Sequence, residues 1–196
     1  MPICYKNNTA PEDIKNMYTW FDQHKPKYGG TFHANEDNFL PFLKCLTINS
    51  ILDVGTGRGD FCNWAIDELC DTVIGLDLAI QPRPEFTKKN IKFITAPAHN
   101  IPLPDKCVDM TVSFDVLEHV RPEDISKTIT EMVRVTKRCM LHCVSKSPSK
   151  TAVAGKKLEL HLIQQHRITW RDDIFLKAHP NFKFIKVMGR SLFIII

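Results

Sequence analysis

The sequence predicts an α/β fold, in which a mostly parallel sheet of seven strands has helices on both faces and ends in an antiparallel C-terminal hairpin. Short apolar runs of strand length alternate with helix-like segments from about residue 48 onward. One run, residues 51–54, breaks into closely spaced glycines, and the next, residues 72–76, ends at Asp77. The last run, residues 191–196, has no polar tail, which is typical of a strand buried within a sheet.

The N-terminal segment, residues 1–47, is predicted to contain two helices. Residues 10–24 have Thr9 as a candidate N-cap, Pro11 near the first helical position and acids in the first turn. After a loop with Pro and Gly, a second helix is expected from Glu36 to about Leu46. These helices would form a lid over the rest of the domain or pack on the edge of the sheet.

The core, residues 48–196, follows in regular alternation. The glycines lead into a helix that ends near Leu69, and the strand that finishes at Asp77 comes next. The later expected elements are a strand at 91–95, a strand at 107–114, an amphipathic helix at 122–136, a strand at 139–144, a loop at 145–157, a helix at 171–179, and strands at 182–188 and 191–196 joined by a turn at Gly189 and Arg190.

The length of 196 residues suits one globular domain, residues 1–196, with a core large enough to fold without disulfides or metal. A hydrophobic content of 43% and a mean hydropathy of -0.18 are ordinary for a soluble protein. No apolar run has membrane-spanning length, and the first twelve residues lack the layout of a signal peptide. A cytoplasmic protein is therefore expected.

The seven cysteines include no C-x-x-C pair, and most of them lie in apolar runs. This pattern favours reduced core residues over a zinc site or a disulfide framework, so no metal is expected. They are Cys4, Cys45, Cys62, Cys70, Cys107, Cys139 and Cys143.

The charge is unevenly distributed along the chain. The net charge of +4 combines a basic C-terminal third, Lys137 to Ile196, with 12 Lys or Arg and three acids, and an acidic remainder. A basic region of this kind attracts an anionic substrate, such as a phosphorylated metabolite or a nucleic acid, although a solvated basic surface would have the same composition.

The glycines at positions 55, 57 and 59 predict a ligand-binding turn between a strand and a helix, because they permit backbone angles and close approach that a Cβ would prevent. A dinucleotide site would have a third glycine where Asp60 stands, and a carboxylate there would oppose a pyrophosphate. A tight turn without any ligand is the remaining alternative.

The order D-x-G-x-G-x-G, formed by Asp53, Gly55, Gly57 and Gly59, resembles the first motif of the class I S-adenosylmethionine-dependent methyltransferases. The resemblance extends in order over residues 48–196 and implies a Rossmann-like methyltransferase fold with S-adenosylmethionine as cofactor. It also implies that the N-terminal helices lie over the cofactor or the substrate.

Asp77 stands 20 residues after Gly57, at the end of the neighbouring strand. An acid at that distance accepts hydrogen bonds from the ribose hydroxyls of a bound nucleotide, so Asp77 and the adjacent Leu78 are expected at the cofactor. The segment after the third strand resembles the part of this family that passes under adenine, but Pro97 replaces the usual acid. Adenine recognition then falls to Ala98 and His99.

The fourth strand and the residues after it, S-F-D-V-L-E-H-V, resemble methyltransferases that modify small metabolites. The resemblance places Ser113 and Phe114 beside the methionine portion of the cofactor. DNA-base methylation is disfavoured, because the sequence has neither the N-P-P-Y type of motif that holds a flipped base nor a Pro-Cys nucleophile.

A catalytic base is harder to identify, since methyl transfer needs one only when the acceptor must lose a proton. His119 and His161 are the candidates because both are expected near carboxyl ends of strands, although each also suits a structural role. His142, within the fifth strand, is expected in the core.

The favoured function is methyl transfer to a small acceptor, for which the basic C-terminal third favours an anionic one. RNA or protein as acceptor, a non-catalytic cofactor-binding subunit that activates a partner, and a nicotinamide oxidoreductase are the alternatives. The sequence names neither the acceptor nor the oligomeric state.

Overall fold

The computed structural model describes residues 43–80, 82–86, 90–121, 123–144, 183–187 and 190–194. The predicted N-terminal helices, apart from their end at residues 43–44, lie outside the described residues, as do His161 and the predicted helix at 171–179. The elements are β1 (Ser50–Val54), α3 (Asp60–Glu68), β2 (Thr72–Asp77), η1 (Pro84–Phe86), β3 (Ile91–Thr95), β4 (Val108–Phe114), η2 (Leu117–His119), α4 (Ile125–Val135), β5 (Thr136–Cys143), β6 (Lys183–Val187) and β7 (Arg190–Ile194).

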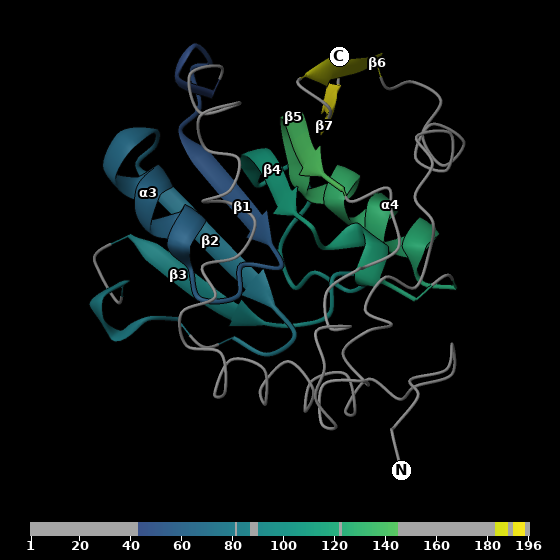
Figure 1. Ribbon diagram of the computed structural model, residues 1–196, viewed down its shortest axis with the longest axis horizontal. Helices are drawn as coiled ribbons and strands as arrows, with labels where there is room; N and C mark the ends of the chain where they lie inside the picture. The colour runs from purple at the N-terminus through teal and green to yellow at the C-terminus, as the bar shows by residue number, and fades with distance from the viewer. Residues whose placement is uncertain are drawn as a thin grey trace, which may run out of the picture.

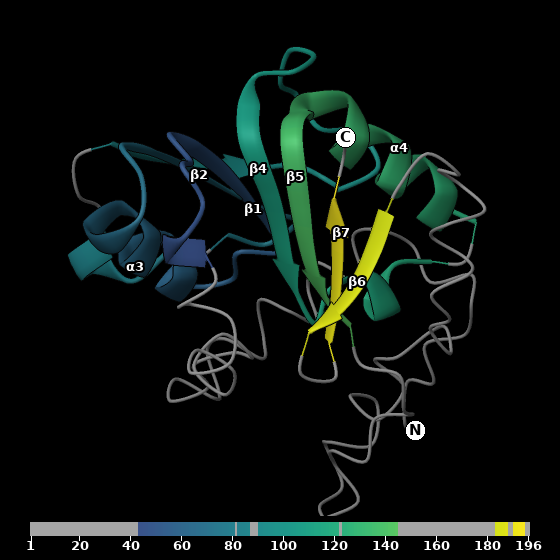
Figure 2. The ribbon, with the colours of Figure 1, turned by 90° about the horizontal axis from the view of Figure 1, so that it is seen from above.

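The sheet has the strand order β3-β2-β1-β4-β5-β7-β6, and β1 to β5 run parallel to one another (Figure 1). These five strands confirm the predicted parallel α/β architecture. The backbone of β7 pairs antiparallel with β5 and β6 (Figure 2). That arrangement agrees with the expected count of seven strands and the C-terminal hairpin, which stay predictions.

Two hydrophobic clusters form because successive side chains of a strand point to opposite faces of the sheet. Ile51 packs with Phe61 and Ala65 of α3, whereas Leu52 packs with the residues of α4 that face the sheet, among them Ile129. The two helices therefore cover opposite faces, as the alternation of apolar residues predicted.

The boundaries around α4 differ from the prediction. The helix begins at Ile125 rather than at 122, and β5 begins at Thr136 rather than at 139. The Oγ1 of Thr136 donates a hydrogen bond to the carbonyl of Met132, 2.5 Å away, and so ends the helix where the strand starts. In the C-terminal hairpin, Arg190 was expected in the turn but is paired with Val187 as the first residue of β7.

Within the described ranges, no helix is long and apolar enough to cross a membrane. The six cysteines of these ranges form no disulfide with one another; Cys62, Cys70 and Cys143 are buried, whereas Cys45 is exposed, so the expectation of core positions does not hold for Cys45.

Candidate functional site

The strand order reverses between the neighbouring strands β1 and β4. Ligands of open α/β sheets bind at such a reversal, in the crevice beyond the carboxyl ends of the strands. The glycine loop, residues 55–59, follows β1 directly, and Phe114 ends β4. Most of the predicted cofactor residues are therefore brought to this crevice by the topology alone.

The glycine loop has a fixed shape that side chains would disturb in different ways. The N–H groups of Gly55 and Thr56 both donate to the carbonyl of Leu76, at 2.7 and 3.1 Å, and so tie the loop to the end of β2. Gly55 has a φ of +78°, and a Cβ there would lie 2.2 Å from Cγ2 of Val116. Gly57 has a φ of +53°, and a Cβ there would meet no atom of the described residues within 4 Å. The space at Gly57 is open to a ligand.

Asp77 is bonded to main-chain N–H groups on both of its carboxylate oxygens. Its Oδ2 accepts from Gly57 at 2.8 Å, and its Oδ1 accepts from Ala79 at 3.0 Å. Burial raises the pKa of Asp77, and hydrogen bonds from Ala79, Gly57 and Leu78 act in the opposite direction. The predicted ribose acid is thus fixed to the middle of the glycine loop.

Asp53 lies under the same loop and is almost completely buried, with 2% of its surface exposed. The thiol of Cys62 donates to Oδ2 of Asp53 at 3.6 Å, and that sulfur is 3.1 Å from Oγ1 of Thr56. Burial raises the pKa of Asp53 to about 7, opposed by hydrogen bonds from Thr56 and Cys62, while the charge of Asp77 raises it further. The charge of Asp77 therefore makes ionisation of Asp53 less favourable.

Asp60 has a cationic partner that its sequence position did not reveal. It is the first residue of α3, and its Oδ1 accepts from Nε of Arg83 at 3.0 Å. The main-chain N–H of Arg83 also donates to the carbonyl of Arg58 at 3.1 Å. Arg83, in the segment after β2, thus balances the charge of Asp60. The acids whose charge would oppose a bound pyrophosphate are then Asp53 and Asp77.

The turn after β3 begins beside Asp77, the predicted ribose acid, because the N–H of Ala96 donates to the carbonyl of Asp77 at 3.0 Å. The N–H of Asn100 donates to the carbonyl of Pro97 at 3.0 Å and closes the turn. Ala98 is half-buried, and Nδ1 of His99 lies 3.7 Å from Oδ2 of Asp124. The ring of His99 therefore contacts the segment just before α4.

Ser113 and Phe114 lie at the carboxyl end of β4, as predicted, but both side chains have protein partners. Oγ of the buried Ser113 is 2.6 Å from Nδ1 of His142, its partner in the register of β4 and β5. The ring centroid of Phe114 is 5.0 Å from that of Phe61 in α3. Burial lowers the pKa of His142 to about 3, so this core histidine is neutral.

His119 ends η2 and is half-buried, and its N–H donates to the carbonyl of Val116 at 2.9 Å. The residue before it, Glu118, is completely buried. His119 thus lies in the segment that leaves the carboxyl end of β4, whereas His161, the other candidate base, is outside the described residues.

The sequence did not identify four residues as part of the site, namely Thr56, Cys62, Arg83 and Val116. Only Thr56 lies within the glycine motif, and nothing in a local pattern marks the contacts of the other three. Among the described residues, no group of three or more His, Cys, Asp or Glu could hold a metal ion.

Residues 52–139 match the family described as a methyltransferase domain, a stretch that begins in β1 and ends in β5. Over these residues the chain carries a class I S-adenosylmethionine-dependent methyltransferase domain. The cofactor of this family is S-adenosylmethionine, so the expectation drawn from the glycine motif is confirmed.

A curated relative of this chain is the tRNA (carboxymethyluridine(34)-5-O)-methyltransferase of Arabidopsis thaliana, 30% identical over 132 residues. The match covers 66% of this chain and 32% of the relative, so the chain spans about a third of the relative's length.

Solved structures share the fold at low sequence identity. A chain of the complex between the Haloferax volcanii Trm112 methyltransferase activator and a methyltransferase has a TM-score of 0.66 at 15% identity, covering 86% of this chain and 77% of that one. The Burkholderia thailandensis 1,6-didemethyltoxoflavin-N1-methyltransferase, solved with 1,6-didemethyltoxoflavin and S-adenosylhomocysteine, has a TM-score of 0.65 at 12% identity, with 98% and 91% covered.

A pair of alanine substitutions separates the two roles of the loop glycines. Gly57→Ala should cost about 1 kcal/mol of unfolding free energy, because only the left-handed backbone is strained. Gly55→Ala should cost about 3 kcal/mol or more, because its Cβ also overlaps Val116. Urea unfolding measures both, and Val116→Ala should recover part of the loss only in the Gly55→Ala protein. Equal losses for the two glycines would contradict this geometry.

Asp53 should make the ligand-free protein less stable as the pH rises. Its pKa in the folded state, about 7, lies above that of an unfolded chain, so the stability it contributes is complete near pH 4 and is lost toward pH 7. The difference in unfolding free energy between Asp53→Asn and the wild type should therefore move by about 3 kcal/mol in favour of the variant from pH 5 to pH 8. A difference that stays constant over this range would contradict the raised pKa of the buried Asp53 carboxyl.

Proposed function

We propose that this methyltransferase transfers the methyl group of S-adenosylmethionine to an anionic acceptor, of which a small metabolite is the first candidate. The observation that carries the proposal is the bond between Asp77 and Gly57 beside open space at the strand-order reversal. The fixed carboxylate of Asp77 and the space beside Gly57 thus lie together where the strands end, which supports a ligand site there.

The charges of the site fit this cofactor better than they fit a dinucleotide. Asp53 and Asp77 have raised pKa values, and within the described ranges no lysine or arginine forms an ion pair with either. A ligand with sulfonium and ammonium cations would relieve this unfavourable charge, whereas a pyrophosphate would increase it. The donor and acceptor set is therefore complementary to S-adenosylmethionine.

Each part of the cofactor has candidate residues. The fixed oxygens of Asp77 would accept from the ribose hydroxyls, with Leu78 beside them, and Gly57 would allow the close approach. The turn with Ala98 and His99 would receive adenine. Asp53, Gly55, Gly59, Ser113 and Phe114 would shape the crevice at the methionine portion.

The cofactor supplies an activated methyl group, so the protein's own contribution is chiefly to bind and orient the reactants and to exclude water. A base is required only where the acceptor loses a proton. His119, at the carboxyl end of β4, and His161 are the candidates for this role. His142 is unsuited to it, because it is buried, neutral and bonded to Ser113.

RNA is the second candidate acceptor, and one comparison favours it: the similarity to a tRNA methyltransferase over two thirds of this chain. The basic C-terminal third is compatible with either acceptor. We also retain, as proposals, the seven-stranded sheet with its C-terminal hairpin and a single domain in which residues 1–47 form a lid or edge segment.

Cofactor binding can be tested by calorimetric titration. The wild type should bind S-adenosylmethionine in preference to NAD, and Asp77→Ala should weaken that binding about a hundredfold through loss of the ribose contacts and of the bond to Gly57. Asp71→Ala, at an exposed position just before β2, is the matched control and should leave the affinity unchanged. Binding of NAD alone would reject the proposed function.

The acceptor class can be tested with S-adenosylmethionine that carries a labelled methyl group. Incubation with a protein-free metabolite filtrate should transfer label to small anionic compounds, whereas incubation with total tRNA should leave the RNA unlabelled. Label that enters tRNA and falls steeply as salt increases would instead select the RNA acceptor. Cofactor binding without transfer to either would favour a non-catalytic subunit.

A further inference from the structure

The segment that joins β3 to β4, Ala96–Lys106, is bonded along the length of α4. His99 contacts Asp124 just before the helix, and the N–H of Ile101 donates to Oε2 of Glu131 at 2.9 Å near its end. Beyond Ile101, Nζ of Lys106 donates to two carbonyls at the end of the helix, those of Val133 at 3.2 Å and Thr136 at 2.7 Å. We call residues 96–106 the β3–β4 segment.

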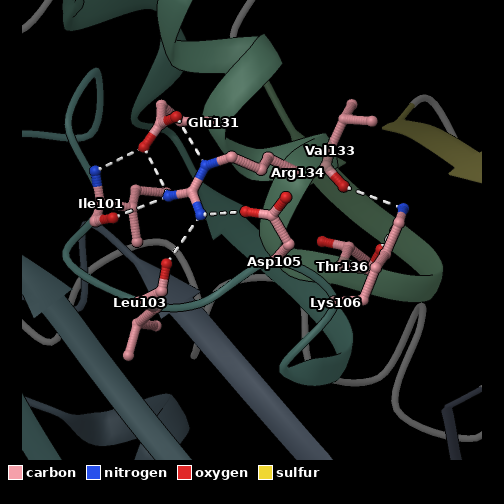
Figure 3. A network of polar contacts seen from close by, with 8 residues as sticks. All are labelled: Ile101, Leu103, Asp105, Lys106, Glu131, Val133, Arg134 and Thr136. Carbon is pink, nitrogen blue, oxygen red and sulfur yellow. Dashed lines mark hydrogen bonds and ion pairs between the residues drawn. The ribbon is translucent and has the colours of Figure 1, made fainter.

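Arg134 contributes the densest group of bonds to this segment (Figure 3). Its Nε and Nη2 each donate at 2.8 Å to one oxygen of Glu131. Its Nη1 donates to the carbonyl of Leu103 at 2.7 Å and to Asp105 at 2.8 Å, and Nη2 also donates to the carbonyl of Ile101 at 2.8 Å. A guanidinium has five N–H groups, and each has an acceptor here.

These bonds fix the main chain rather than one side chain. Ile101 is held at both polar groups, its N–H by Glu131 and its carbonyl by Arg134, while its side chain is buried against α4. At the other end, the N–H of Ala96 is bonded to the carbonyl of Asp77. The Pro97–Asn100 turn is therefore held between the ribose acid and the Arg134 group.

Pro97 stands where the resemblance leads one to expect an acid, so the position of this turn matters for binding the cofactor. Proline has no acceptor on its side chain, so this side chain cannot pair with the amino group of adenine as a carboxylate would. Discrimination of the base then depends on the main-chain groups of the turn, and their position depends on the bonds that hold the turn at each end.

We propose that Arg134 is a positioning residue for the cofactor, which sets where the Pro97–Asn100 turn meets the adenine ring and thereby sets the preference for adenine. This inference rests on the proposed function, because it assumes that the crevice binds S-adenosylmethionine. The N–H groups of Arg134 are all bonded to protein atoms, so it would act through the main chain of Ile101 and Leu103. A lysine cannot replace it, because an ammonium lacks the planar fork that reaches two carbonyls and two carboxylates at once.

The test compares two ligands that differ only at the base. Calorimetry would measure the affinity for S-adenosylhomocysteine and for S-inosylhomocysteine, in which a carbonyl oxygen replaces the amino group of adenine. The wild type should prefer the adenine ligand about tenfold or more. Arg134→Lys should weaken S-adenosylhomocysteine about tenfold and change S-inosylhomocysteine less than about twofold, so the preference is lost.

The matched control is Arg138→Lys. Arg138 also donates to a main-chain carbonyl, that of Thr47, but it lies near the amino end of β5, away from the crevice. This variant should keep the preference for adenine. Glu131→Gln, which weakens the same group of bonds less drastically, should reduce the preference partially and serves if Arg134→Lys does not fold.

The possible outcomes are distinct. If the variants that weaken the Arg134 group bind both ligands as the wild type does, or lose equal affinity for both, Arg134 has only a structural role and this inference is wrong. A wild type that binds both ligands equally overturns it as well, while leaving cofactor use intact. A wild type that binds neither ligand rejects the cofactor site itself.

Discussion

The hydrogen bond between the Asp77 carboxylate and the N–H of Gly57 is the interaction on which the cofactor crevice depends. It joins the end of β2 to the middle of a loop whose three glycines have positive φ angles. Holding such a loop in one conformation costs entropy, and this bond, with those from Gly55 and Thr56 to Leu76, offsets that cost. The same bonds fix the Asp77 oxygens, which keep further lone pairs for a ligand.

The acids at the proposed cofactor site differ from the acids around it, because they have no cationic partner among the described residues. Asp60, Asp124 and Glu131 each have an arginine partner, namely Arg83, Arg121 and Arg134. Asp53 and Asp77 lack a cationic partner among the described residues, and each has a raised pKa. Buried acids without a cationic partner lower the stability of the ligand-free protein. A cationic cofactor would remove this unfavourable contribution.

The sequence predicted what depends on local pattern. Patterns within a few residues predicted the glycine turn and the bounds of β3 at 91–95. The distance from one strand to the next predicted the position of Asp77 beside the glycine loop. It missed the start of β5, because Thr136 ends α4 through a side-chain bond that propensity does not reveal. Partners such as Arg83 for Asp60 and Asp105 for Arg134 are more than 20 residues apart, and only the folded chain brings them together.

The two ends of the cofactor crevice are therefore built by different physical means. The proposed ribose end uses one side chain, Asp77, that is bonded directly to the glycine loop, so a change there would act on the ligand without an intermediary. At the proposed adenine end, the turn after Pro97 is held from α4 through main-chain bonds to Ile101 and Leu103. Substitutions far from the ligand should then matter at the adenine end more than at the ribose end. In the proposed site, the preference for adenine therefore depends on the framework that positions the backbone rather than on a single contact residue.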